Sequence, residues 1–201
     1  MEVKKDIEIK NLDLFKINMN ECEIVYSSDL LYALLYNEGM IAVVDITDKK
    51  IISKFTNEKN CRLSKVKFSQ NYITYINRKP NHSEIVINNL KFIGQYYEYK
   101  IEENVLDYLY YDEYLFVVTY SWELYTINSF ENTRKNNINN DVRYSFNGFN
   151  IAHMQMIRDG ENKNLIIIVN NGFVLNYRII NEDCFYEDKT LLECFNNMSR
   201  K

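Results

Sequence analysis

The sequence predicts an all-β protein: a small β-propeller of four or five blades, or part of one, with a short C-terminal helix. Apolar runs rich in Ile, Val and Tyr alternate with polar turns along most of the 201 residues, as in antiparallel strands. The pattern also repeats, because corresponding strands begin at Leu31, Tyr72, Tyr114 and Leu165, at spacings of 41, 42 and 51 residues. Propeller blades have a period of roughly 40 to 45 residues. A β-sandwich or barrel, the alternative fold, gives no reason for such a period.

The clearest copy of the repeat runs from residue 30 to residue 56. It contains three apolar runs, at 31–36, 40–46 and 51–56, separated by two short polar turns. The first turn contains Gly39, which tolerates backbone conformations that other residues avoid. This copy therefore predicts three successive antiparallel strands.

Part of this copy resembles a known repeat. In residues 41–55, IAVVDITDKKIISKF, an apolar strand ends in Val44-Asp45 before a polar turn and a second strand. The pattern resembles the third and fourth strands of a WD40 repeat, with Val44-Asp45 in the place of the Trp-Asp pair. The resemblance implies four-stranded blades in a ring, often about seven of them. The chain is too short for seven, so we expect a smaller ring or a partial propeller.

The later copies follow the same plan. Expected blades lie at about residues 21–60, 61–103, 104–147 and 148–187. Within the second to fourth copies, strands are predicted at 64–69, 72–77, 84–88, 92–100, 105–111, 114–120, 123–128, 151–157, 165–170 and 173–179. The polar stretch 129–141 is too poor in apolar residues to pack, so we expect a loop there and a strand at 142–146 after it. This loop accounts for the long third interval.

The two ends of the chain receive separate predictions. Residues 6–17 form alternating runs that suit an N-terminal closing strand, paired with the last blade. Thr190 and Glu193 fit a capping box, which predicts a C-terminal helix over 190–198. Leu191, Phe195 and Met198 fall on one face of that helix, which we expect to pack against the propeller.

Composition excludes several classes of protein. The formal net charge of −4 excludes a uniformly basic nucleic-acid binder. The first ten residues are charged throughout, and no apolar run approaches the roughly 18 residues that would suggest a membrane span. The four cysteines are far apart and form no metal-binding pair, so we expect them to be reduced. These features predict a cytosolic or nuclear protein, with the cytoplasm as the expected location and no membrane partner.

Charge is segregated along the chain. Residues 48–79 contain nine basic and two acidic side chains, whereas residues 96–131 contain eight acidic side chains and one basic. Such segregation suits either a charged partner or simply a solvated surface. The basic span predicts a partner-binding face of Lys49, Lys50, Lys54, Lys59, Arg62, Lys65, Lys67, Arg78 and Lys79. The acidic span predicts aromatic and acidic contacts from Tyr96, Tyr97, Tyr99, Asp112, Glu113 and Trp122, with Trp122 as the strongest candidate for a contact hot spot.

The raw material for catalysis is sparse. Five scattered glycines cannot form a phosphate-binding loop, and two histidines offer little for metal sites or catalytic triads. We expect His153 to be a structural histidine within a strand and His82 to be exposed in a loop. Acidic pairs at Asp112-Glu113 and Glu182-Asp183 leave a propeller that acts on glycosides as the least favoured hypothesis. No enzyme, cofactor, metal or small-molecule substrate is predicted.

The sequence therefore suggests a non-catalytic protein that docks onto a large protein or ribonucleoprotein assembly. The most specific hypothesis is a ribosome-bound dormancy or hibernation factor, whose basic face contacts rRNA phosphates while the acidic span contacts basic proteins of the particle. No residue motif supports this last step. The alternative is a WD40-like adaptor subunit of a multiprotein complex, which completes a partner's propeller or is completed by it.

Overall fold

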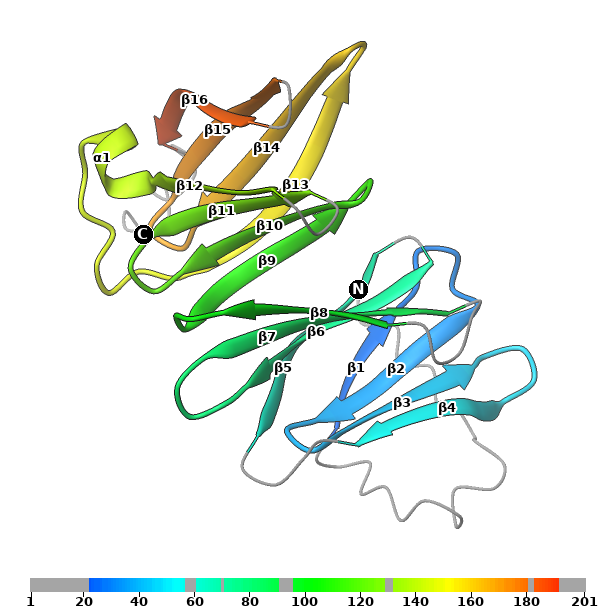
Figure 1. Cartoon of the computed structure of the whole chain (residues 1–201). Helices are drawn as coiled ribbons and strands as arrows, with labels where there is room; N and C mark the ends of the chain where they lie inside the picture. Colours follow the sequence, from blue (N-terminus) through cyan, green and yellow to red (C-terminus); the bar gives the residue numbers. More distant parts are fainter. Residues whose placement is uncertain are drawn as a thin grey trace, which may run out of the picture. The chain divides into compact units, whose positions relative to one another are not determined.

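The computed structural model describes residues 22–56, 61–69, 71–90, 96–128, 132–180 and 183–191. In these residues sixteen strands form four separate four-stranded antiparallel sheets, and each sheet takes its strands in chain order (Figure 1). This arrangement confirms the predicted all-β fold built from repeated four-stranded blades. No helix in the described residues is long and apolar enough to cross a membrane.

The strands of the four sheets have the following bounds. The first sheet contains β1 (Glu23–Tyr26), β2 (Tyr32–Asn37), β3 (Met40–Asp45) and β4 (Lys50–Thr56). The second contains β5 (Arg62–Ser69), β6 (Tyr72–Arg78), β7 (Ser83–Asn89) and β8 (Tyr96–Ile101). The third contains β9 (Val105–Tyr111), β10 (Tyr114–Thr119), β11 (Glu123–Asn128) and β12 (Asn132–Asn137). The fourth contains β13 (Ile151–Asp159), β14 (Asn162–Val169), β15 (Phe173–Ile180) and β16 (Asp183–Leu191).

The chain divides into two compact units, Met1–Glu102 and Glu103–Lys201, which are described separately. Each unit holds two sheets whose first strands approach each other: β1 approaches β5, and β9 approaches β13. In the first three sheets, the second and third strands are mostly buried, and in the first two sheets the fourth strand is more exposed. This gradient is expected when apolar faces of neighbouring sheets pack together and the outermost strands meet solvent.

The core of each unit lies between its two sheets. In the first unit, Leu34, Ile41 and Val43 of the first sheet pack in one cluster with Leu63 and Ile73 of the second. In the second unit a larger cluster joins the third and fourth sheets. Its largest fully buried members are Phe116, Trp122, Phe146 and Tyr177. Successive side chains of a strand point to opposite faces, so the other face of β2 and β3 carries a second buried cluster of Ala33, Leu35, Ala42 and Val44.

The stretch predicted as a loop at 129–141 is instead largely structured. Its strand β12 pairs with β11, and a short helix, α1 (Ile138–Val142), follows directly. An outermost strand needs backbone pairing rather than apolar side chains, so the polar composition of β12 does not prevent it from forming. In α1, Ile138 and Val142 lie four residues apart and are both buried. The strand predicted at 142–146 is absent from the described structure, where Phe146 lies in an irregular segment and is fully buried.

The two predicted terminal elements have different outcomes. The closing strand at 6–17 lies outside the described residues. Thr190 and Leu191, the first two residues of the helix predicted over 190–198, are the last residues of β16, and residues 192–198 lie outside the described residues. Thr190 pairs with Val174 and Leu191 with Phe173, so the hydrogen bonds of the fourth sheet outcompete the local capping signal.

Candidate functional site

A groove of the first unit lies between its two sheets, at the end where the β2–β3 turn is located. It has a volume of about 510 Å³, which falls in the range of roughly 300 to 1,000 Å³ typical of ligand sites. Side chains from both sheets line it: Glu23, Tyr36, Asn37, Glu38, Leu63, Ser64, Lys65 and Arg78. We call this cavity the blade groove. Most of its lining residues are polar or charged, and Leu63, only 5% exposed, is an apolar one.

One side of the blade groove is acidic and comes from the first sheet. The Tyr36 hydroxyl donates a hydrogen bond of 2.5 Å to Oε2 of Glu23, which joins β2 to β1. Burial, together with this carboxylate, raises the pKa of Tyr36 well above its usual value. Glu38, in the β2–β3 turn, forms an exposed ion pair of 3.6 Å with Arg62. The backbone oxygen of Glu38 also accepts a bond of 2.8 Å from the Leu63 amide, which fixes the turn to β5.

The other side of the blade groove is basic and comes from the second sheet. Arg78, at the end of β6, donates from Nε to Oγ of Ser64 at 3.0 Å, which orients its guanidinium group. Lys65 lies in an irregularity of β5, where pairing with β6 shifts between Ser64 and Lys67. Its φ of 53° is in the left-handed region, which is uncommon for a lysine and re-aims the side chain.

The structure separates the nine predicted basic residues. Arg62, Lys65 and Arg78 lie at or beside the blade groove. The other six predicted residues lie elsewhere. Lys79 forms an ion pair of 2.8 Å with Glu84, and Lys67 is half-buried in β5. Lys54 is exposed in the outer strand β4, Lys49 and Lys50 lie at the β3–β4 turn, and Lys59 falls outside the described residues.

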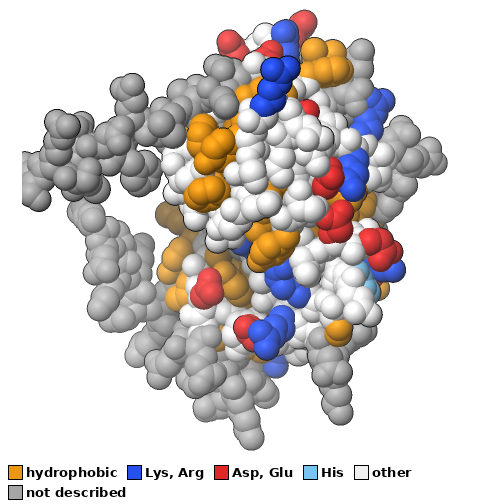
Figure 2. All heavy atoms as spheres, turned by 90° about the vertical axis from the view of Figure 1, so that its left-hand side faces the viewer, with side chains coloured by type: hydrophobic (Ala, Val, Ile, Leu, Met, Phe, Trp, Pro, Cys, Tyr) orange, Lys and Arg blue, Asp and Glu red, His pale blue; other side chains and the backbone are white. Residues whose placement is uncertain are grey.

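The β3–β4 turn is at the opposite end of the first sheet from Glu38. The register shows this, because Asn37 pairs with Met40 at one end of the sheet and Asp45 pairs with Lys50 at the other. On the face drawn in Figure 2, Lys and Arg side chains stand next to Asp and Glu side chains rather than gathering in a patch. Residues that are close in sequence therefore point to different ends of the blades, which the spacing of charges alone did not reveal.

The predicted aromatic and acidic contacts also divide between the two units. In the first unit, Tyr96 and Tyr97 of β8 are 57% and 39% exposed, while Tyr99 is half-buried. In the second unit, Asp112 and Glu113 form the tight β9–β10 turn, with φ of 48° and 68°. Tyr96 and Tyr97 are therefore exposed enough to contact a partner, whereas the Asp112 carboxylate already contacts basic side chains of its own unit.

Those basic side chains come from the neighbouring sheet. Arg158 of β13 bonds the Asp112 carboxylate, and Lys163 of β14 lies 3.8 Å from it. Arg158 also stands over the Tyr111 ring at 5.4 Å, and Lys163 over the Tyr114 ring at 5.5 Å. The turn therefore helps to join the third and fourth sheets, a structural role that supports neither catalysis nor docking by Asp112.

The prediction that Trp122 is an exposed hot spot is wrong. Trp122 is 1% exposed and its ring lies 4.9 Å from that of Phe146, within the core of the second unit. It adopts a φ of 61° between β10 and β11. Phe146 belongs to the non-repeating segment after α1, so the repeat pattern gave no sign that this segment covers Trp122.

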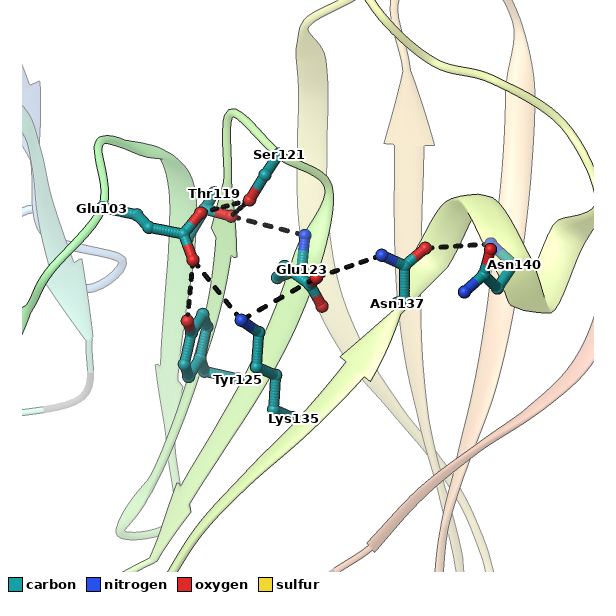
Figure 3. A network of polar contacts seen from close by, with 8 residues as sticks. All are labelled: Glu103, Thr119, Ser121, Glu123, Tyr125, Lys135, Asn137 and Asn140. Carbon is teal, nitrogen blue, oxygen red and sulfur yellow. Dashed lines mark hydrogen bonds and ion pairs between the residues drawn. The ribbon is translucent and has the colours of Figure 1, made fainter.

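Sequence reasoning missed a polar network in the second unit that is organised around Glu103 (Figure 3). Tyr125 donates to Oε1 of Glu103 at 3.0 Å, Lys135 lies 3.5 Å from the same oxygen, and Ser121 bonds the other carboxylate oxygen. Burial raises the pKa of Glu103, but the bonds from Ser121, Tyr125 and Thr119 outweigh it and lower the pKa.

The network continues to the start of α1. Lys135 lies 3.8 Å from Glu123, which accepts a bond of 3.0 Å from Asn137, and Asn137 caps α1 by accepting from the Asn140 amide at 3.0 Å. It thus joins β10, β11, β12 and the helix. Glu103 could not be found from sequence, because its partners, from Thr119 to Lys135, lie 16 to 32 positions away.

The remaining candidates for catalysis are not assembled into a site. His82, predicted to be exposed, is half-buried and lies 3.1 Å from Glu84, whereas His153, predicted to be a satisfied structural residue, is exposed on β13. Burial alone would raise the pKa of Glu84, but Lys79 and His82 lower it. No group of three or more His, Cys, Asp or Glu suited to a metal ion occurs in the residues that the structure describes. Of the second acidic pair, Asp183 begins β16 and Glu182 is outside the described residues.

No protein-family model and no curated protein matches the sequence. Solved structures do match. One is a chain of the yeast heterotrimeric Nup82-Nup159-Nup116 nucleoporin complex, with a TM-score of 0.61 and 10% identity, covering 90% of this chain and 68% of the other. Another is the WD40 domain of SCAP from fission yeast, with a TM-score of 0.51 and 9% identity, covering 85% of this chain and 42% of the other. The fold is that of a β-propeller built from four-stranded antiparallel blades.

The propeller fold by itself does not fix an activity. It is also found in the dihydro-heme d1 dehydrogenase NirN in complex with DHE, with a TM-score of 0.53 and 13% identity, covering 85% of this chain and 39% of the other. The chain thus spans between 39% and 68% of the length of these three structures. Function must therefore be argued from the residues of this chain.

Proposed function

We propose that the protein is a non-catalytic interaction propeller, an adaptor subunit of a multiprotein complex. The observation that carries the proposal is the blade groove, which presents fixed acidic and basic side chains between two sheets. The Tyr36 hydroxyl in the groove donates to Glu23, and burial raises its pKa, so it is held as a neutral donor rather than as a nucleophile. Such a lining suits recognition of charged and polar groups.

The likeness to a chain of a nucleoporin complex supports a protein partner, because that propeller works within a multiprotein assembly. The ribosome-bound factor suggested by the sequence receives less support. Its basic face needs several cations at one end of the blades, and Lys49 and Lys50 lie at the opposite end of the first sheet from Arg62. The proposal that a partner completes the propeller, and a cytoplasmic location, stay predictions.

The test is to isolate the tagged full chain from its native cells after mild crosslinking and to identify what elutes with it. An adaptor is expected in a protein assembly well above the 24.2 kDa monomer, at both low and moderate salt and after nuclease treatment. Elution as a free monomer under all these conditions would refute the adaptor. Loss of the assembly on nuclease treatment would instead favour the ribonucleoprotein hypothesis.

A further inference from the structure

We propose that the blade groove binds an extended peptide segment of a protein partner that carries both an acidic and a basic side chain. The acidic side chain of the peptide pairs with Arg78 and Lys65, and the basic side chain pairs with Glu23 and Glu38. The inference rests on the proposed function and deepens it, because it names the chemistry of the partner.

Arg78 is oriented for a ligand carboxylate. Its Nε is occupied by the bond to Ser64, and its two Nη atoms have no partner among the residues that the structure describes. A guanidinium group held at one nitrogen presents its remaining donors in a fixed plane, the geometry that recognises a carboxylate. The half-buried position of Arg78 limits competition from water, which strengthens such a contact.

Lys65 adds a second positive charge at the cost of an unfavourable backbone conformation. A non-glycine residue in the left-handed region is strained, and such strain clusters at ligand sites. Val66, next to Lys65 in the irregularity, is 4% exposed and packs in the core of the unit. The buried Val66 anchors the strand while the bulge turns Lys65 to the lining of the groove.

The acidic side makes a peptide a better occupant than a polyanion. Glu23 and Glu38 line the same cavity as Lys65 and Arg78, so the charges of the lining cancel. An RNA strand would bring its phosphates against two carboxylates, and this repulsion opposes binding. A peptide offers amide donors and side chains of both signs, so it can satisfy both sides together.

The groove is also formed before a ligand arrives. The bond from the Leu63 amide to the Glu38 oxygen joins the two sheets at its edge, and the bond of 2.9 Å from the Gly39 amide to Oδ1 of Asn37 fixes the β2–β3 turn. Leu63 supplies a buried apolar contact for the body of the peptide. A preformed site loses less entropy on binding than a mobile one.

The experiment selects ligands from a library of random linear peptides on the immobilised full chain and measures selected peptides by fluorescence anisotropy. We expect the selected peptides to share an Asp or Glu and a Lys or Arg at a constant spacing. Arg78→Gln and Glu23→Gln should each weaken binding roughly tenfold, the size expected for a lost charge-assisted hydrogen bond. Lys65→Gly removes the amine yet suits the positive φ, so it should weaken binding several-fold without lowering thermal stability.

Two further variants separate recognition from general effects of charge or folding. Lys54→Gln removes an exposed positive charge from β4, outside the groove, and should bind like the wild type. Arg78→Glu should lose the selected peptide and regain affinity for a version whose acidic residue is replaced by lysine. That reversal cannot result from unfolding.

Three results would overturn the inference. The first is a set of selected peptides without a common acidic residue, and the second is a set of groove variants that bind peptides like the wild type. The third is a single-stranded RNA oligonucleotide that binds more tightly than any peptide and binds less tightly to the same variants. The last result would show that the blade groove binds RNA rather than a peptide. If the protein assembly still forms while the groove variants have no effect on peptides, the groove inference alone fails. If peptides bind as expected while the chain elutes only as a monomer, the adaptor proposal alone fails.

Discussion

Replacing Trp122 by alanine tests the assignment of this residue to the core rather than to a contact surface. The side chain is 1% exposed and packs on Phe146 with ring centres 4.9 Å apart. A buried Trp→Ala change typically costs about 3 to 5 kcal/mol, through lost burial and the cavity that remains. For a chain of this size, about 2 to 4 °C per kcal/mol predicts that Tm falls by roughly 6 to 20 °C.

The assay is thermal unfolding followed by far-ultraviolet circular dichroism, because Trp122 is the only tryptophan and its fluorescence is lost in the variant. Tyr120→Ala is the matched control: Tyr120 lies two residues away and is 58% exposed, so its loss should change stability by less than about 0.5 kcal/mol. A Trp122→Ala protein that unfolds at the wild-type temperature but loses its partner would refute the argument and restore the contact hot spot.

Three further predictions concern titratable groups. Burial raises the pKa of the Cys184 thiol to about 11, so native Cys184 should be alkylated about a hundredfold more slowly than an ordinary thiol. Peptide mass spectrometry should show that the more exposed Cys61 is alkylated first. Equal alkylation rates for the two cysteines would contradict the burial of Cys184. Burial alone would raise the pKa of Glu103, but hydrogen bonds outweigh burial and lower the pKa below its ordinary 4.5. The ionised Glu103 therefore stabilises the folded protein above that pH, and this stabilisation is lost on acidification. Glu103→Gln should therefore flatten the acid side of a plot of unfolding free energy against pH. Burial and the Asp141 charge raise the pKa of Tyr177, so the neutral hydroxyl stabilises the folded protein fully below pH 10.0, and this stabilisation is lost as the pH rises further. A Tyr177→Phe variant whose unfolding free energy falls at alkaline pH just as in the wild type would contradict this.

The strands of the repeat were predictable because their signals are local. Residues 105–111 and 114–120 were expected as strands around Asp112-Glu113, and the structure has β9 and β10 within one residue of these bounds. Here alternating apolar residues and a polar two-residue turn act over fewer than ten positions. The same holds for the hairpin around Gly172, whose φ of 93° is one that glycine adopts readily.

The features that were missed depend on contacts between distant residues. The polar strand β12 forms because β11 supplies its hydrogen bonds, and Trp122 is buried because Phe146 returns to cover it. The blade groove could be predicted only in part. The sequence showed that Lys65 and Arg78 are basic, but their meeting with Glu23 across two sheets follows from packing that no local pattern encodes.

The order of strands has a consequence for how the protein is made. Every strand pairing that the structure describes joins strands that are neighbours in the chain. At roughly 5 to 20 residues per second, synthesis takes seconds to deliver each blade. A hairpin closes in about 1 to 10 μs. Each sheet is thus able to finish its pairing before the similar strands of the next one emerge, so synthesis order itself guards the repeats against pairing with one another.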